Sequence, residues 1–174
     1  STNINLLSNS NFEHILNGQE PSTSIQTNQD NIFPWITTAA NEKIEIWRNG
    51  NLDVPSYSGN YFAALNAAGG PKLFQTFVAD QNHTGLQKVK LSFARRAQFS
   101  NSDQIKVSIE QNGSTLDDQT LSSNPNSWDY ETVELHPFLL AGNSELVFES
   151  IPPGSGTGQP AVADNPYVTG EKGN

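Results

Sequence analysis

Short runs in which apolar and polar residues alternate constrain this chain more than any other feature. Val89, Leu91 and Phe93 share one side of such a run, and Ser92 lies on the side that we expect to face water. A period of two residues is typical of a β-strand with one buried face, and residues 105–109 repeat it. The chain lacks the longer period of amphipathic helices. The pattern therefore predicts an all-β fold.

Turn-forming residues separate these runs. Gly69-Gly70-Pro71 stands between expected strands at 61–65 and 73–78, and Asn112-Gly113 is the strongest hairpin signal in the chain. The spacing of these turn-forming residues predicts roughly eight to ten short strands, which is typical of two packed sheets. We therefore expect a two-sheet β-sandwich of jelly-roll type.

The same reasoning sets the expected limits of the domain and its loops. Residues 1–170 form one domain, and 171–174 form a frayed tail. Residues 14–31 are polar and contain glycine and proline, so we expect one long loop there, and 48–60 forms a second loop. A Gly-rich stretch at 154–158 reads as a further loop.

Composition excludes several kinds of protein. The 174 residues carry a net charge of -9, which disfavours binding to nucleic acid or to an anionic membrane surface. No apolar run is long enough to span a bilayer. The absence of cysteine excludes disulfides, thiolate catalysis and cysteine-based zinc sites. Cation binding is the more natural electrostatic property of such a chain.

Three motifs follow one another in an order that resembles a known group of domains. Asn5-Leu6-Leu7 precedes Phe12-Glu13, Phe33-Pro34-Trp35 leads into Ile44-Glu45-Ile46, and Ala163-Asp164-Asn165 follows the Gly-rich loop. This order resembles the galactose-binding-like jelly-roll domains found as carbohydrate-binding modules, in bacterial surface adhesins and in plant cell-wall proteins. The resemblance covers almost the whole chain, and it implies a β-sandwich that often binds sugars.

Carboxylates near the two ends of the chain suggest a metal site. If the ends lie side by side, Glu13 and Asp164 repel each other unless a proton or a hard cation such as Ca²⁺ separates them. The resemblance implies that these two residues bind a structural calcium ion together with backbone carbonyls, and Asn11 could add an oxygen. The alternative is that both are ordinary surface carboxylates. Pro166 departs from the family pattern and puts the length of the last strand in question.

Sugar recognition needs aromatic faces and planar polar groups that bond adjacent hydroxyls. Loops and strand ends carry three candidate aromatic residues and three candidate charged residues. They are Trp47, Tyr57 and Trp128, and Arg95, Arg96 and Asp53. Arg95 continues the inward face of Leu91 and Phe93, so it must find a carboxylate such as Asp53 or a ligand. The alternative for the arginine pair is a solvated strand end.

No residue pattern points to catalysis. His14, His83 and His136 lack the spacing of a metal site or a triad, and no nucleophile elbow is present. We expect a non-catalytic, calcium-stabilised carbohydrate-binding domain, extracellular or at the cell surface, within a larger secreted protein. The alternative is an adhesin module that binds protein or peptide through loops 14–31 and 48–60, or that acts as a spacer.

Overall fold

The computed structural model describes residues 5–65, 71–79, 84–97, 104–151 and 161–172, the last range by its backbone alone. Strands dominate it. One sheet contains β1 (Ser24–Asn28), β3 (Lys43–Arg48), β4 (Tyr61–Leu65), β6 (Gly85–Ala97), β9 (Asp129–Leu135), β10 (Phe138–Leu139) and β12 (Ala161–Lys172). The other contains β2 (Ile36–Thr37), β5 (Leu73–Ala79), β7 (Gln104–Gln111), β8 (Ser114–Ser122) and β11 (Gly142–Ile151).

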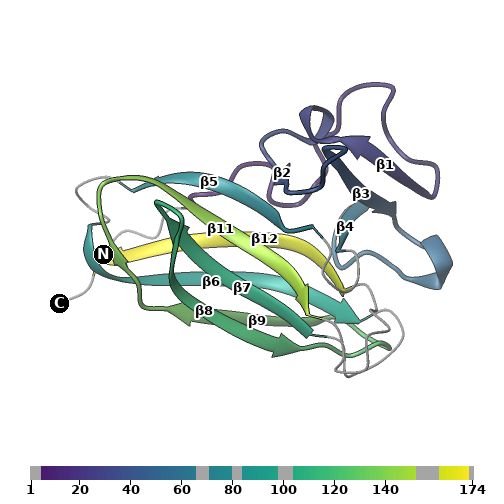
Figure 1. Ribbon diagram of the computed structural model, residues 1–174. Coiled ribbons are helices and arrows are strands. Elements are labelled where there is room, and N and C mark those ends of the chain that lie inside the picture. The colour runs from purple at the N-terminus through teal and green to yellow at the C-terminus, as the bar shows by residue number, and fades with distance from the viewer. Residues whose placement is uncertain (1–4, 66–70, 80–83, 98–103, 152–160, 173–174) are drawn as a thin grey trace.

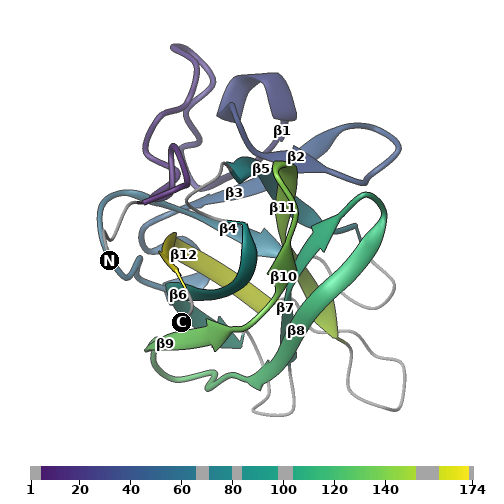
Figure 2. The same cartoon turned by 90° about the vertical axis from the view of Figure 1, so that its left-hand side faces the viewer.

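The two sheets pack against each other as a sandwich (Figures 1 and 2). In the first sheet the strand order is β1-β3-β4-β12-β6, with β9 and β10 both pairing to β6. The second sheet has the order β2-β5-β11-β7-β8, and the pairings in both sheets are antiparallel. The predicted all-β, two-sheet jelly-roll fold is confirmed. Two 3-10 helices, η1 (Gln29–Ile32) and η2 (Asn51–Asp53), lie in the connections.

Apolar residues that alternate along the strands meet between the two sheets. Phe93 from the first sheet packs on Phe148 from the second with their ring centroids 5.4 Å apart, and Trp35 lies 6.2 Å from Phe148. All three side chains are fully buried. Burying a side chain of this size stabilises the fold by about 1.5–3 kcal/mol. The predictions that Trp35 is a core residue and that Ile44 and Ile46 share an inward face are confirmed.

Two sequence-based expectations about exposure and loops are wrong. Ser92 is only 1% exposed, because β9 and β12 flank β6 at this position. Its hydroxyl oxygen lies 2.8 Å from that of Thr132 on β9. Residues 14–31 are not one loop, because β1 lies within them and pairs with β3. Ile25 is the only large aliphatic residue in β1, so the edge strand depends on backbone pairing more than on an apolar pattern.

The hairpin and the last strand follow their turn chemistry. Asn112 and Gly113 have φ angles of 53° and 78°, as a type I′ turn requires, and they join β7 to β8. β12 shifts its register between Asp164 and Tyr167, so Pro166 lies in a β-bulge, where it need not donate a ladder hydrogen bond.

β12 continues to Lys172, opposite Gln87, beyond the point where the sequence predicts fraying. The expected turn at 69–70, the expected loop at 154–158 and His83 lie outside the described residues. No helix in the described part of the chain has the length and apolar character needed to cross a membrane.

Candidate functional site

The N-terminal segment fastens the two sheets together at one edge. The side-chain amide of Gln75, which is buried in β5, accepts a hydrogen bond from the Ser8 amide at 2.7 Å and donates one to the Ser8 carbonyl at 2.8 Å. The Gln75 side chain thus satisfies the backbone N–H and C=O of Ser8, as a neighbouring strand would. The chain then turns at Asn9 and Phe12, both with positive φ, and buries Phe12 against Trp35 at a centroid distance of 4.8 Å. The Trp35 indole donates to the Asn9 carbonyl at 2.8 Å.

This turn directs Glu13 to the start of β4 in the other sheet. Its carboxylate accepts hydrogen bonds from the backbone amides of Asn60 at 2.8 Å and Tyr61 at 2.9 Å, and from the Asn60 side chain at 3.2 Å. Gly59 makes room for it, since a Cβ there would lie 2.7 Å from the Glu13 Cδ. Hydrogen bonds to a carboxylate are stronger than neutral ones. Glu13 is therefore an anchor between the N-terminal segment and the first sheet.

The register of β12 brings the C-terminal motif to the same place. Ala163 pairs with Ala63, two residues after Tyr61, and the next residue, Asp164, pairs with Ala94 on β6. The Asp164 side chain lies outside the described part of the structure. The Asn11 Oδ1 accepts the Glu13 amide at 3.2 Å. Among the described residues, no three His, Cys, Asp or Glu side chains cluster as a metal site would require.

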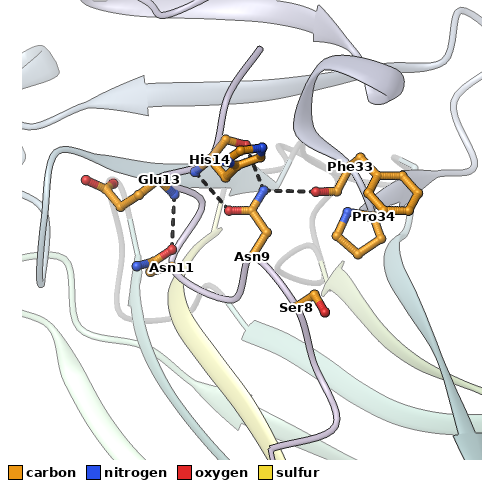
Figure 3. Close-up of a pocket in the computed structure, with 7 residues that line it drawn as sticks. All are labelled: Ser8, Asn9, Asn11, Glu13, His14, Phe33 and Pro34. Carbon is orange, nitrogen blue, oxygen red and sulfur yellow. Dashed lines mark hydrogen bonds between the residues drawn. The ribbon is translucent and has the colours of Figure 1, made fainter. Parts of the chain in front are cut away.

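A pocket of about 410 Å³ lies beside this anchor (Figure 3). Its lining comprises Ser8, Asn9, Asn11, Glu13, His14, Phe33 and Pro34. The Asn9 side chain is used internally, because it accepts from the His14 amide and donates to the carbonyls of His14 and Phe33. The Phe33 ring is 72% exposed, and the Glu13 carboxylate points away from it (Figure 3). The polar groups here mainly hold the turn in shape.

The three candidate aromatic residues meet on the outer face of the first sheet. Trp47 on β3 packs on Phe62 of β4, and the Trp128 ring stands edge-on to Phe62 at a centroid distance of 5.3 Å. The Trp128 indole donates to the Pro55 carbonyl at 2.7 Å, which fastens loop 48–60 over this face. Trp47 is only 5% exposed. It supports the surface aromatic residues rather than offering its own ring.

Tyr57 and Tyr130 form the accessible part of this aromatic group. Their rings stack at a centroid distance of 5.2 Å with an interplanar angle of 7°, and they are 43% and 42% exposed. Sequence reasoning missed Tyr130, because it appeared out of phase with Glu131 and the inward residues of β9. The pairing of β9 with β6 has no register shift, so Trp128 and Tyr130 simply occupy the other face, with Trp128 just before the strand. Strand parity alone could have identified Tyr130.

A row of polar side chains crosses the same face. Gln26 on β1 pairs with Glu45 on β3, and Glu45 pairs with Ala64 on β4. Ala64 pairs with Val162 of β12, which pairs with Arg96 on β6. We call Gln26, Glu45 and Arg96 the polar row. It carries an amide, a carboxyl and a guanidinium on one sheet face, with Ala64 and the Val162 position of β12 between the carboxyl and the guanidinium. The sequence identified only Arg96.

Burial changes the chemistry of this row. Burial raises the pKa of the Glu45 carboxyl above its usual range, and the nearby Trp47 indole partly offsets this shift by favouring the ionised form. The Trp47 Nε1 lies near the Glu45 carboxyl but outside normal hydrogen-bond geometry, so its ring is already used within this face. The Arg96 Nε is buried and makes no hydrogen bond of normal geometry to a described residue. Buried polar groups are nearly always paired with protein, water or ligand. Arg96 is therefore a donor that a bound molecule could satisfy.

The other two charged candidates lie elsewhere. Arg95 points inward as predicted and is 7% exposed. Its Nε donates to the Ser122 carbonyl at 2.9 Å, and its Nη1 lies 3.0 Å from the Glu131 Oε1. Its partner is thus Glu131 rather than Asp53, and the pair joins the first sheet to the end of β8. Asp53 is exposed in η2, on the loop that covers the aromatic group.

Comparison with known proteins identifies the fold. No protein-family model matches the chain, and no curated protein matches it in sequence. Solved structures do match it in shape. A cyclase from Fischerella sp. TAU in complex with 4-(1H-indol-3-yl)butan-2-one has a TM-score of 0.69 at 15% identity, with 100% of each chain covered.

Two carbohydrate-binding modules are also similar. TmCBM61, in complex with beta-1,4-galactotriose, has a TM-score of 0.61 at 14% identity and covers 97% of this chain and 99% of its own. The CBM22-1 xylan-binding domain of Xyn10C from Paenibacillus barcinonensis has a TM-score of 0.57 at 12% identity, with 87% and 94% covered. These likenesses are structural, and they show that the chain has the jelly-roll β-sandwich fold of carbohydrate-binding modules.

Proposed function

We propose that this protein is a non-catalytic carbohydrate-binding domain and that it binds sugar on the outer face of the first sheet. The observation that carries the proposal is the exposed, stacked pair Tyr57 and Tyr130 on the same face as Arg96, whose buried Nε has no hydrogen-bond partner among the described residues. Carbohydrate-binding modules among the structural neighbours support it.

The chemistry of the face suits a hydroxyl-rich ligand. The aromatic rings can contact the apolar side of a pyranose, while hydroxyl groups of the sugar accept from Arg96 and donate to Glu45. Because β4 and β12 lie between Glu45 and Arg96, different hydroxyls of one glycan would bond the two groups. Trp47, Phe62 and Trp128 hold the surface aromatic residues in place, which lowers the entropy lost when a sugar is bound.

The calcium ion belongs to the same proposal. Glu13 already accepts three hydrogen bonds, which leaves about one of its acceptor positions for a cation. Asp164 and backbone carbonyls would have to supply most of the remaining ligands, with Asn11 at the edge. The neighbouring position of the Asp164 backbone supports this arrangement. If Ca²⁺ binds the folded form, the melting temperature falls when a chelator is added.

Affinity electrophoresis and titration calorimetry with xylan and β-1,4-galactan, with and without Ca²⁺, test sugar binding, and a glycan array widens the search. Tyr57→Ala and Tyr130→Ala should each weaken binding without unfolding the protein. Phe138→Ala is the matched control, since this ring is 62% exposed on β10. If both tyrosine variants still bind sugar as the wild type does, or if the wild type binds no sugar, the results favour the protein-binding or spacer module instead.

The cyclase neighbours and Glu45 support a second candidate, an enzyme that uses this face. A half-buried carboxyl with a raised pKa can act as a general acid. Turnover of an aromatic substrate by the wild type that is lost in Glu45→Gln would establish it.

For location, we propose that the domain works outside the cell or at its surface, as part of a larger protein.

A further inference from the structure

The polar row does not end at Gln26. Beyond it lies a hollow of about 420 Å³, lined by Gln26, Ala39, Ala40, Asn41, Lys43 and Pro71, which we call the end hollow. A separate hollow of about 20 Å³ shares Lys43 and Pro71 with it, but Thr37 and Leu73 of the second sheet also line that space. Because Gln26 belongs to both the end hollow and the polar row, the end hollow directly adjoins the row.

The wall of the end hollow is held in shape by its own hydrogen bonds. The Ala39 amide donates to the Thr37 hydroxyl, and the Ala39 carbonyl accepts from the Glu42 amide at 3.0 Å. The Lys43 amide donates to the Asn41 Oδ1 at 3.0 Å. The two alanines leave the space open because their side chains are small. A preformed hollow costs a ligand little ordering entropy.

We infer that the end hollow is a further sugar subsite, so that the protein binds a longer stretch of glycan chain than the aromatic group alone can hold. From Gln26 on β1 to the aromatic group at β9, the sheet face crosses β1, β3, β4, β12, β6 and β9, and five strand spacings of about 4.8 Å give a length of about 24 Å. A sugar unit in an extended chain is about as long as one such spacing. A glycan that reaches from the aromatic group to the end hollow therefore needs roughly four or five units.

The aromatic group and the end hollow differ in chemistry. Tyr57 and Tyr130 offer aromatic surface at the β9 end, whereas the described lining of the end hollow contains no aromatic ring. Its polar side chains are those of Gln26, Asn41 and Lys43, which can bond sugar hydroxyls. The end hollow therefore adds affinity for a longer chain through hydrogen bonds, while the aromatic end supplies the main contact.

This inference rests on the proposed sugar binding, and calorimetry with xylo-oligosaccharides and β-1,4-galacto-oligosaccharides separates the two. The wild type should bind the hexasaccharide of its preferred series about tenfold more tightly than the trisaccharide, equivalent to about 1.4 kcal/mol. Lys43→Met and Ala40→Phe should remove most of that gain and leave trisaccharide affinity within about twofold. The first removes the charge, and the second fills the hollow. Lys106→Met on the opposite sheet is the control, and it should keep the gain.

Each outcome decides a different point. If no oligosaccharide of any length binds, the proposed function itself fails. If the trisaccharide and the hexasaccharide bind equally, or if both end-hollow variants keep the full gain, the end hollow is not a subsite although the aromatic site stands. Circular dichroism of Ala40→Phe verifies folding, and Lys43→Met at an exposed position provides a second variant that leaves packing unchanged.

Discussion

The anchor around Glu13 and the outer face of the first sheet both place a glutamate beside the same sheet, but they treat its polar groups in opposite ways. Around Glu13 each carboxylate oxygen meets backbone amides, and Gly59 is shaped to admit it. On the outer face, Glu45 is half-buried with a raised pKa, and Arg96 keeps a buried nitrogen without a described partner.

The difference separates groups that stabilise the fold from groups that are kept for a ligand. A paired polar group lowers the free energy of the native state, whereas a buried unpaired group raises it until something binds. Removing a side chain at the anchor should therefore cost stability. Removing one from the polar row should cost affinity and leave stability intact or improved. Four substitutions test this contrast.

Glu13→Ala should have the largest effect on stability. It leaves the Asn60 and Tyr61 amides without their acceptor and frees the N-terminal segment from β4. Hydrogen bonds to charged groups contribute about 1.5–3 kcal/mol each, and partial access of water to the amides limits the total loss to about 3 kcal/mol. Urea denaturation measures it. Glu134→Ala, which removes only exposed ion pairs, should cost less than about 1 kcal/mol.

Gly59→Ala should destabilise the protein by about 2 kcal/mol. Its φ of +64° disfavours a side chain by about 1–2 kcal/mol, and the new Cβ would displace Glu13. The second part of this cost depends on Glu13, so Gly59→Ala should cost less in the Glu13→Ala background. A double-mutant cycle measures the coupling. Equal costs in both backgrounds would show that the close approach of the two residues contributes nothing.

The sequence predicted most of the framework because burial and turn chemistry act locally. The alternation of residues 89–93, the Asn112-Gly113 turn and the core position of Trp35 are each determined by a few neighbouring residues. β1 and the two-residue strands β2 and β10 were missed because they have too few apolar residues to show a period. Their pairing partners lie elsewhere in the chain.

The candidate site was only partly predictable, because its residues come together through strand register. The sequence singled out Trp47, Tyr57 and Trp128 as candidates, but no local pattern shows that Trp47 lies beneath loop 48–60. The polar row depends on which strands pair. Glu45 and Arg96 share one row, with β4 and β12 between them, only because the chain's last strand inserts between β4 and β6. Alternation within one strand cannot indicate such an insertion.

Arg96→Leu should separate affinity from stability. It removes a buried donor that lacks a described partner, so the free energy of unfolding should stay the same or rise, while sugar affinity should fall about tenfold. Arg95→Leu is the matched control on the neighbouring position. It breaks contacts to Ser122 and Glu131, so it should lower stability. A loss of stability in Arg96→Leu equal to that in Arg95→Leu would remove the contrast between the two faces of β6.

Glu45→Gln should have the smallest effect, and its sign depends on pH. Because burial raises the pKa of Glu45 above 4.5, ionisation of this carboxyl opposes folding. Below the unfolded pKa the carboxyl is protonated in both states, and the free energy of unfolding is not reduced. As the pH rises through the folded pKa, ionisation of Glu45 lowers the free energy of unfolding of the wild type. Glutamine cannot ionise, so the variant should melt slightly higher than the wild type at pH 7, and the difference should vanish near pH 4. A variant that instead melts lower than the wild type at pH 7, with the gap closing toward low pH, would mean that Glu45 has a charge partner on this face, and that the outer face is built like the Glu13 anchor after all.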